Sequence, residues 1–293
     1  MADNGAALHA ARPTRITAAA FRRMKGRGER ITMLTAYDYR SARLFDAAGV
    51  DGLLVGDSLG MVVLGHETTV PVTVDDVIHH CRPVAHAAQR ALVVADLPFM
   101  SYTTSREQAL TNAARLVQEG GSQAVKLEGG RSVAGTVDAL VTAGVPVMGH
   151  IGLTPQSILR FGGYRVQGRG KAAAQHLVDD ARALEDSGAF AVVLELVAAQ
   201  VAERITAALK IPTIGIGAGA ACDGQIQVMH DILGYDVPGG FVPKHAHQFA
   251  NVGDTILEAV KRYVSEVQTG AFPTEAQSFT LDESVLKAIG EER

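Results

Sequence analysis

Short apolar runs alternate along most of the chain with longer segments whose apolar residues recur at helical spacing. A short apolar or β-branched run is typical of a buried strand, and a spacing of three and four is typical of an amphipathic helix. The first three strands are predicted at residues 31–35, 52–55 and 91–95. Helices are predicted at 39–48, from a capping box between Thr73 and Asp76, and from a second capping box between Thr104 and Glu107.

The same alternation continues to about residue 250. Further strands are predicted at 123–127, 145–149, 191–194 and 213–216, and helices at 133–142, 172–186, 198–209 and 226–232. The eighth strand is poorly marked, and Phe241-Val242 is its best candidate. Apolar strands between amphipathic helices indicate a parallel sheet covered on its outside. Seven clear units and a faint eighth predict a closed (β/α)8 TIM barrel of the α/β class.

We expect residues 1–293 to form a single domain, because the length fits one barrel of ~250 residues with extensions. Two average domains would also fit this length. Residues 1–14 are expected to be a disordered tail and 15–250 the barrel, entered through a short helix. Residues 251–293 are expected to form a C-terminal helix near 255–268 and a polar tail, so the barrel carries helical extensions at both ends.

Composition narrows the classes of function. A net charge of −4 gives no electrostatic reason to expect nucleic acid or a membrane as partner, and no apolar run approaches the ~20 residues that span a bilayer. Cys81 and Cys222 lie far apart and outside any C-x-x-C pattern, as expected of reduced thiols in a cytoplasmic protein. Residues 9–28 hold several arginines and no acidic residue, so an organellar transit peptide remains the alternative.

Five consecutive strands are followed by charged or titratable residues. In order along the chain these are Asp57 with Ser58, Asp96, Lys126 with Glu128, His150, and Glu195. Parallel strands of a barrel all end at the same face, and that face carries the active site of barrel enzymes. Taken singly, each residue has a structural explanation, such as a helix cap, an ion pair or a packing histidine. Their recurrence on five strands predicts a functional site.

Three of these residues, Asp57, Asp96 and Glu128, predict an oxygen-rich site for a hard divalent cation such as Mg²⁺. Zinc and copper prefer histidine and thiolate ligands. Such a cation would hold an α-keto acid and stabilise its enolate. Glu195 is then free to act as general base, with its pKa raised by apolar neighbours, and Lys126 supplies positive charge for a substrate carboxylate.

Two glycine-rich segments follow predicted strands. Residues 215–219 read Gly-Ile-Gly-Ala-Gly and predict either a phosphate-binding turn or a tight turn that only lines the pocket. Residues 161–170 combine glycines, arginines and a tyrosine, which predicts a mobile lid or a plain flexible loop.

Several motifs resemble those of the ketopantoate hydroxymethyltransferase (3-methyl-2-oxobutanoate hydroxymethyltransferase) family, over about residues 32–279. They are Thr35-Ala-Tyr-Asp38, Val55-Gly-Asp-Ser-Leu-Gly-Met-Val-Val63, Thr68-Thr-Val-Pro-Val-Thr-Val-Asp-Asp76, Ala95-Asp-Leu-Pro-Phe99, Val125-Lys-Leu-Glu-Gly129, Gly149-His-Ile-Gly-Leu-Thr-Pro155 and Gly215-Ile-Gly-Ala-Gly219. Asp223-Gly-Gln225 and His230-Asp231 also match.

The resemblance implies a Mg²⁺-dependent, homodecameric TIM-barrel enzyme of pantothenate and coenzyme A biosynthesis. Such an enzyme transfers a one-carbon unit from 5,10-methylenetetrahydrofolate to 3-methyl-2-oxobutanoate (α-ketoisovalerate) and gives 2-dehydropantoate (ketopantoate), by enolate formation and aldol-type addition. It also implies that Asp57, Asp96 and Glu128 hold the metal and that Glu195 is the catalytic base. The residues implied to bind the substrate are Asp57, Ser58, Asp96, Lys126 and His150.

The chain departs from the family pattern after Pro243-Lys244, where His245 and His247 replace an aromatic residue and a lysine. The departure concerns the C-terminal edge of the pocket and leaves the core residues intact. Two other functions remain open: a carbon–carbon lyase of the same broad barrel group, and an inactive barrel that serves as a binding subunit. The Lys-Lys-Cys-Gly-His loop associated with isocitrate lyases is absent from the sequence.

Overall fold

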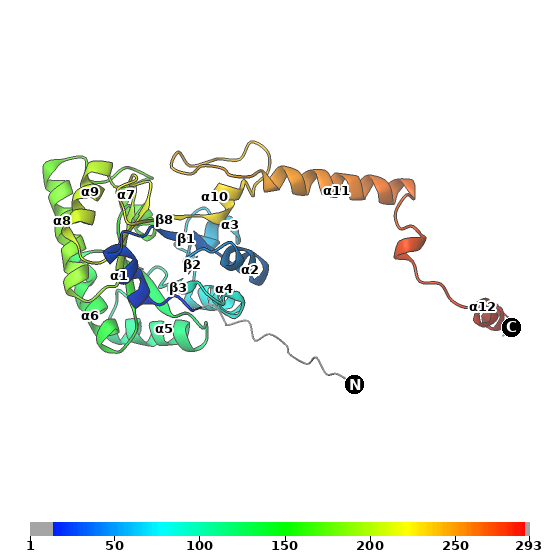
Figure 1. Cartoon of the computed structure of the whole chain (residues 1–293), viewed down its shortest axis with the longest axis horizontal. Coiled ribbons are helices and arrows are strands. Elements are labelled where there is room, and N and C mark those ends of the chain that lie inside the picture. The colour runs from blue at the N-terminus through cyan, green and yellow to red at the C-terminus, as the bar shows by residue number, and fades with distance from the viewer. Residues whose placement is uncertain (1–13, 291–293) are drawn as a thin grey trace, which may run out of the picture.

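The computed structural model of the chain describes residues 14–290, and its centre is a closed barrel of eight parallel strands in sequence order (Figure 1). The strands are β1 (Ile31–Thr35), β2 (Gly52–Val55), β3 (Leu92–Asp96), β4 (Ala124–Glu128), β5 (Val147–Gly152), β6 (Ala191–Glu195), β7 (Thr213–Ile216) and β8 (Gly224–Gln227). Hydrogen bonding from β8 back to β1 closes the barrel. The predicted (β/α)8 fold is confirmed. The predicted tail at residues 1–14 lies, except for Thr14, outside the described residues.

Helices cover the outside of the barrel and extend it at both ends. The α-helices are α1 (Ala18–Gly26), α2 (Tyr39–Ala47), α3 (Leu59–Val62), α4 (Val74–Ala87), α5 (Arg106–Gln118), α6 (Ala134–Thr142), α7 (Ile158–Phe161), α8 (Lys171–Asp186), α9 (Ala199–Ala208), α10 (Met229–Leu233), α11 (Val252–Thr269) and α12 (Glu283–Gly290). Short 3-10 turns are η1 (Arg131–Val133), η2 (Pro155–Ser157) and η3 (Glu275–Gln277). Within residues 14–290, no helix is both long and apolar enough to cross a membrane.

Two apolar cores stabilise this arrangement. The outer core lies between the strands and the surrounding helices, and the inner core fills the barrel with side chains such as Met33 and Met148. Helix α1 closes the amino-terminal end of the barrel, where the fully buried Phe21 packs edge-on against Phe190 with ring centroids 5.8 Å apart. Because this end is closed by apolar packing, the polar strand ends open only at the opposite face.

Of the two capping boxes predicted at helix starts, the structure contains one. The capping box between Thr73 and Asp76 is present, with the hydroxyl accepting from the Asp76 amide and the carboxylate accepting from the Thr73 amide. The second predicted box, Thr104 to Glu107, is wrong by one residue, because Ser105 is the N-cap of α5 and accepts from the Gln108 amide. Several neighbouring hydroxyl residues compete for such a cap, and the spacing alone does not choose between them.

The eighth unit of the barrel is where the sequence prediction fails. Strand β8 spans Gly224–Gln227 and therefore overlaps the helix predicted at 226–232, of which only the short α10 forms. Phe241 and Val242 are exposed and lie in the connection between α10 and α11. Gln225 of β8 is exposed, so this strand lacks the continuous apolar run of a strand covered on both faces. Helix α11 points away from the barrel in Figure 1, and none of its residues is buried.

Candidate active site

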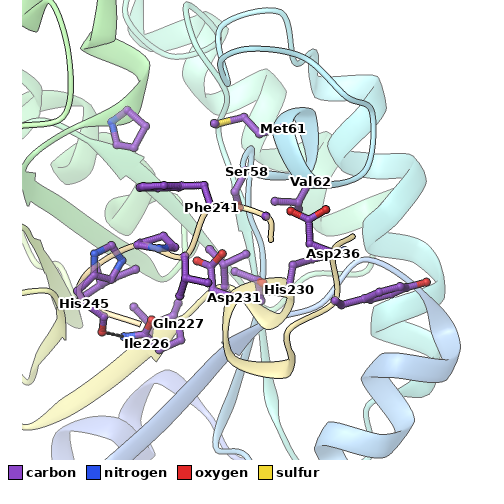
Figure 2. A pocket seen from close by; sticks show the side chains of 18 of the residues that line it. Ser58, Met61, Val62, Ile226, Gln227, His230, Asp231, Asp236, Phe241 and His245 are labelled. Carbon is purple, nitrogen blue, oxygen red and sulfur yellow. Dashed lines mark hydrogen bonds between the residues drawn. The ribbon is translucent and has the colours of Figure 1, made fainter. Parts of the chain in front are cut away.

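All the strand-end residues singled out from the sequence meet at the carboxyl-terminal mouth of the barrel, in a cavity of about 1120 Å³. Strand pairing sets their spacing, since Asp96 lies beside Lys126 and Glu128 beside His150 in the sheet register. Figure 2 views this cavity between side chains of α3, such as Met61, and side chains from α10 and the connection after it, such as Asp231.

A network of buried polar groups forms the floor of the cavity. The Lys126 ammonium lies 2.8 Å from Asp96 Oδ1 in an ion pair that is almost fully shielded from solvent. Asp96 Oδ2 accepts a hydrogen bond from the Asp57 amide at 3.0 Å, and Asp57 Oδ2 accepts one from Gln156 Nε2 at 2.8 Å. The Tyr37 and Ser58 hydroxyls lie 2.8 Å apart. Asp96 is therefore held against the backbone of Asp57, and the Asp57 carboxylate is held separately by Gln156.

Glu128 and His150 continue the network towards Glu195. Glu128 Oε2 accepts from the Gln156 amide at 3.0 Å. His150 Nδ1 lies 3.3 Å from the Lys126 ammonium and 3.5 Å from Glu128 Oε1, and His150 Nε2 lies 3.2 Å from Glu195 Oε2 without hydrogen-bond geometry. Burial, followed by the charge of Lys126, lowers the pKa of His150 well below its usual range. The imidazole is thus neutral, and with Lys126 donating to Nδ1 its proton sits on Nε2, facing Glu195.

The carboxylates of the site crowd one another. Burial first and the Asp96 charge second raise the pKa of Asp57 to about 7. Burial and the charge of Asp57 raise the pKa of Glu128 well above its usual range. Burial also lowers the pKa of Lys126, but the charges of Asp96 and Glu128 outweigh it and the net change is upward. Three buried carboxyl groups therefore share one lysine, and Asp57 and Glu128 retain their protons to higher pH than free carboxyl groups do.

Glu195 is set apart from this cluster at the end of β6. Its side chain is 15% exposed and contacts the site through His150. Burial raises the pKa of Glu195 to about 7, while the positive charges of Lys126 and His245 act in the opposite direction. A carboxyl group that titrates near neutral pH is suited to accept a proton from carbon next to a carbonyl.

The donor set fits a hard divalent cation. Glu128 Oε1 is buried without a hydrogen-bond partner among the described residues, and one ammonium group, that of Lys126, is paired with Asp96 while Asp57 and Glu128 lie nearby. Within residues 14–290, no three histidine, cysteine or acidic side chains are arranged to hold a metal ion on their own. Magnesium is commonly held by only one or two carboxylates, with substrate and water completing its shell, so the residues present fit Mg²⁺ better than an all-protein metal cage.

Sequence reasoning missed the two residues that connect the carboxylates. Gln156 lies in η2 and bonds to Asp57 through its side chain and to Glu128 through its amide. The Tyr102 hydroxyl donates to the Gln156 side-chain oxygen at 2.8 Å and lies 3.0 Å from the Glu128 carbonyl oxygen. Both come from connections after strands, where no periodic pattern singles out a residue. The one available signal was the place of Gln156 in the sequence, directly after Pro155, the last residue of the motif that begins at Gly149.

The two glycine-rich segments both border the site. In the turn after β7, a Cβ on Gly217 would lie 2.6 Å from Leu196 Cδ2, and its φ of +64° favours glycine. This geometry accounts for a tight turn next to Glu195, and the phosphate-binding alternative stays a prediction. Residues 161–170 comprise the last residue of α7 and the connection from α7 to α8, where Tyr164 lines the cavity. The lid also remains a prediction.

Comparison with known proteins identifies the relatives of this chain. The family model described as ketopantoate hydroxymethyltransferase matches residues 15–275. The chain belongs to this family. It is 57% identical to the 3-methyl-2-oxobutanoate hydroxymethyltransferase of Syntrophus aciditrophicus, covering 90% of this chain and 97% of that protein. The protein of the same name from Moorella thermoacetica is 56% identical, with 92% and 99% covered. The chain is therefore an enzyme, a hydroxymethyltransferase, which overturns the inactive-barrel alternative.

Solved structures with low sequence identity share the barrel. A phosphonopyruvate hydrolase in complex with oxalate and Mg²⁺ superposes with a TM-score of 0.58 at 13% identity, covering 95% of this chain and 96% of that one. A 2,3-dimethylmalate lyase of the PEP mutase/isocitrate lyase superfamily gives 0.57 at 17% identity with the same coverage. At these identities the likeness concerns the fold, and it supports the barrel assignment independently of the family match.

Proposed function

We propose that this hydroxymethyltransferase moves a one-carbon unit from 5,10-methylenetetrahydrofolate to 3-methyl-2-oxobutanoate and releases 2-dehydropantoate for pantothenate and coenzyme A biosynthesis. The observation that carries the proposal is the pairing of a carboxylate cluster around one lysine with a separate carboxyl group, Glu195, whose pKa burial raises to about 7. The first feature suits an α-keto acid bound beside a cation, and the second suits removal of a proton from carbon.

Asp57, Asp96 and Glu128 are the residues that would hold Mg²⁺. When bound there, Mg²⁺ supplies a Lewis acid beside the oxygens of the keto acid and makes the proton on C3 more acidic. Ionising these crowded carboxyl groups is costly without a further cation, and bound Mg²⁺ would stabilise their charged forms.

Lys126 and Ser58 orient the keto acid. The ammonium group of Lys126 stays charged in its buried position and attracts the substrate carboxylate. The Ser58 hydroxyl, next to that of Tyr37, is available to hydrogen bond to a substrate oxygen. His150 is neutral and directs its Nε2 proton towards Glu195, so it orients the ionised base and leaves the proton transfer to Glu195.

Glu195 removes the C3 proton, and the C–H electron pair becomes the enolate. The nucleophilic C3 then bonds to the methylene carbon of the donor. Both C–N bonds of that methylene carbon break in the overall reaction: water supplies the hydroxyl oxygen of the product and the two protons taken up by the nitrogens of the donor, which leaves as tetrahydrofolate. Glu195, still protonated after the first step, is positioned to return a proton during release. The cytoplasmic location stays a prediction from the cysteine pattern, and the homodecameric assembly stays a prediction from the resemblance.

The test follows exchange of the C3 proton of 3-methyl-2-oxobutanoate in D₂O by NMR, with and without Mg²⁺ and without any folate. Wild type should exchange the C3 proton in a Mg²⁺-dependent manner. In Glu195→Gln the exchange rate should fall at least about 100-fold, which is the low end of what a positioned general base contributes. Glu203→Gln makes the same chemical change at an exposed position of α9 and should match wild type. A folded, Mg²⁺-loaded wild type that exchanges no faster than the uncatalysed reaction would refute the mechanism.

A further inference from the structure

The cavity is larger than one small keto acid requires. Pockets for drug-sized ligands occupy roughly 300–1,000 Å³, and this cavity, at about 1120 Å³, exceeds that range. The cluster of buried carboxylates lies at its floor. The remaining volume extends outward to α10 and to residues 234–245 after it, which also line the cavity. The outer part therefore has room for a second organic molecule.

Asp231 is a carboxylate of this outer part that has no partner within residues 14–290. It lies in α10 and is half-buried. Among the residues that the structure describes, nothing forms a hydrogen bond or an ion pair with its side chain, and burial alone raises its pKa to about 6. Partly desolvated carboxylates are normally compensated by donors. A ligand with N–H groups would supply them.

Phe241 gives the outer part a flat apolar surface. Its side chain is 86% exposed although it lines the cavity, and Figure 2 places it at the same opening as Asp231 and Ser58. An apolar ring in such a position contributes nothing to the core. Aromatic side chains at binding sites stack on flat rings, at a gain of ~1–3 kcal/mol for a nucleobase.

Two further polar atoms nearby have no partner. Gln227 Oε1 and His230 Nδ1 are both buried and lack a hydrogen bond within the described part of the chain. Both residues line the same cavity, and Figure 2 draws them beside Asp231. Buried polar atoms of native proteins are usually paired, so these atoms indicate hydrogen bonds that a bound molecule completes.

We propose that the outer part of the cavity, between Phe241 and Asp231, binds the flat, nitrogen-rich ring of the one-carbon donor. The inference rests on the proposed function and assigns residues to its second substrate. Phe241 stacks on the ring, Asp231 accepts hydrogen bonds from its N–H groups, and Gln227 with His230 pairs the remaining polar edge. A reduced pterin has this combination of a flat ring and several N–H donors.

Calorimetric titrations test the assignment with two ligands. The first is 3-methyl-2-oxobutanoate with Mg²⁺, and the second is tetrahydrofolate under nitrogen. Phe241→Ala and Asp231→Asn should each weaken tetrahydrofolate binding about tenfold, the effect of losing one stacking or charged contact, with a much smaller effect on the keto acid. Phe241→Tyr keeps the ring and should retain the affinity. Phe249→Ala is the matched control, because Phe249 is 75% exposed and lies outside the cavity lining.

The outcomes separate this inference from the proposed function. Wild type that binds neither ligand refutes the proposed function and the inference with it. Wild type that binds both, with tetrahydrofolate affinity unchanged in Phe241→Ala and Asp231→Asn, overturns only the inference. A change in subunit assembly on Phe241→Ala, with unchanged tetrahydrofolate affinity, also overturns it and makes the ring a contact between copies of the chain.

Discussion

Replacing Glu195 with glutamine should make the metal-free protein more stable at pH 8, and should slow the Mg²⁺-dependent exchange of the substrate proton at least about 100-fold. Burial raises the pKa of the wild-type carboxyl from 4.5 to about 7 in the folded state. Such a difference corresponds to about 3 kcal/mol of folding free energy, because each pKa unit is worth about 1.4 kcal/mol. The neutral amide of glutamine avoids this cost of a buried charge.

The sign depends on pH. Below pH 4.5 the carboxyl group is protonated in both the folded and the unfolded chain, so the raised pKa has no cost. Between about pH 4.5 and 7 the unfolded chain releases the proton while the folded protein retains it, and the wild type loses stability as the pH rises. Above pH 7 the loss is complete. The stability advantage of Glu195→Gln should therefore grow by about 2–3 kcal/mol between pH 5 and pH 8.

Urea unfolding at both pH values, at one protein concentration and with a chelator present, measures this advantage. A fixed concentration is needed because subunit assembly would make the apparent stability depend on it. Glu203→Gln, at an exposed site, should show no such pH dependence. An equal effect of Glu195→Gln at pH 5 and pH 8, or a lower stability than wild type at pH 8, would refute the reasoning. Either result would mean that burial of the charged Glu195 side chain does not lower the free energy of unfolding.

Three other substitutions test separate parts of the structure. Lys126→Met leaves the buried carboxylate of Asp96 unpaired, so urea unfolding should show a free energy of unfolding lower by about 3–5 kcal/mol. Calorimetry should show keto-acid affinity reduced at least about tenfold. A variant as stable as wild type would contradict the ion pair. Protonated His245 lowers the pKa of Glu195, but burial lowers the pKa of His245 itself, so His245→Phe should move the acid limb of the exchange rate only slightly to higher pH, and His247→Phe, at an exposed position, should leave it in place. Phe21→Ala opens a cavity under the barrel and should cost about 3–5 kcal/mol in thermal or urea unfolding; a much smaller loss would mean that α1 does not close the barrel.

The sequence by itself determined the barrel and the identity of the residues at its mouth. Strands β2 to β7 are mostly apolar because nearly all their residues are buried on both faces, and this pattern is local enough to read without coordinates. Parallel strands of a closed sheet end at one face, so a residue such as Asp57 or Glu195 could be assigned to that face from its place after a strand. The family comparison confirms the enzyme class that these positions suggested, and their individual roles stay proposals.

Only the tertiary structure showed where the eighth strand lies and which hydrogen bonds join the residues at the strand ends. Strand β8 has an exposed residue, Gln225, so its pattern is not that of a strand covered on both faces. Gln156 joins Asp57 to Glu128, which are 71 residues apart, through contacts that exist only after the barrel has closed. The raised pKa of Glu195 likewise arises from burial. Burial and long-range hydrogen bonds are properties of the packed molecule, whereas periodicity belongs to the chain.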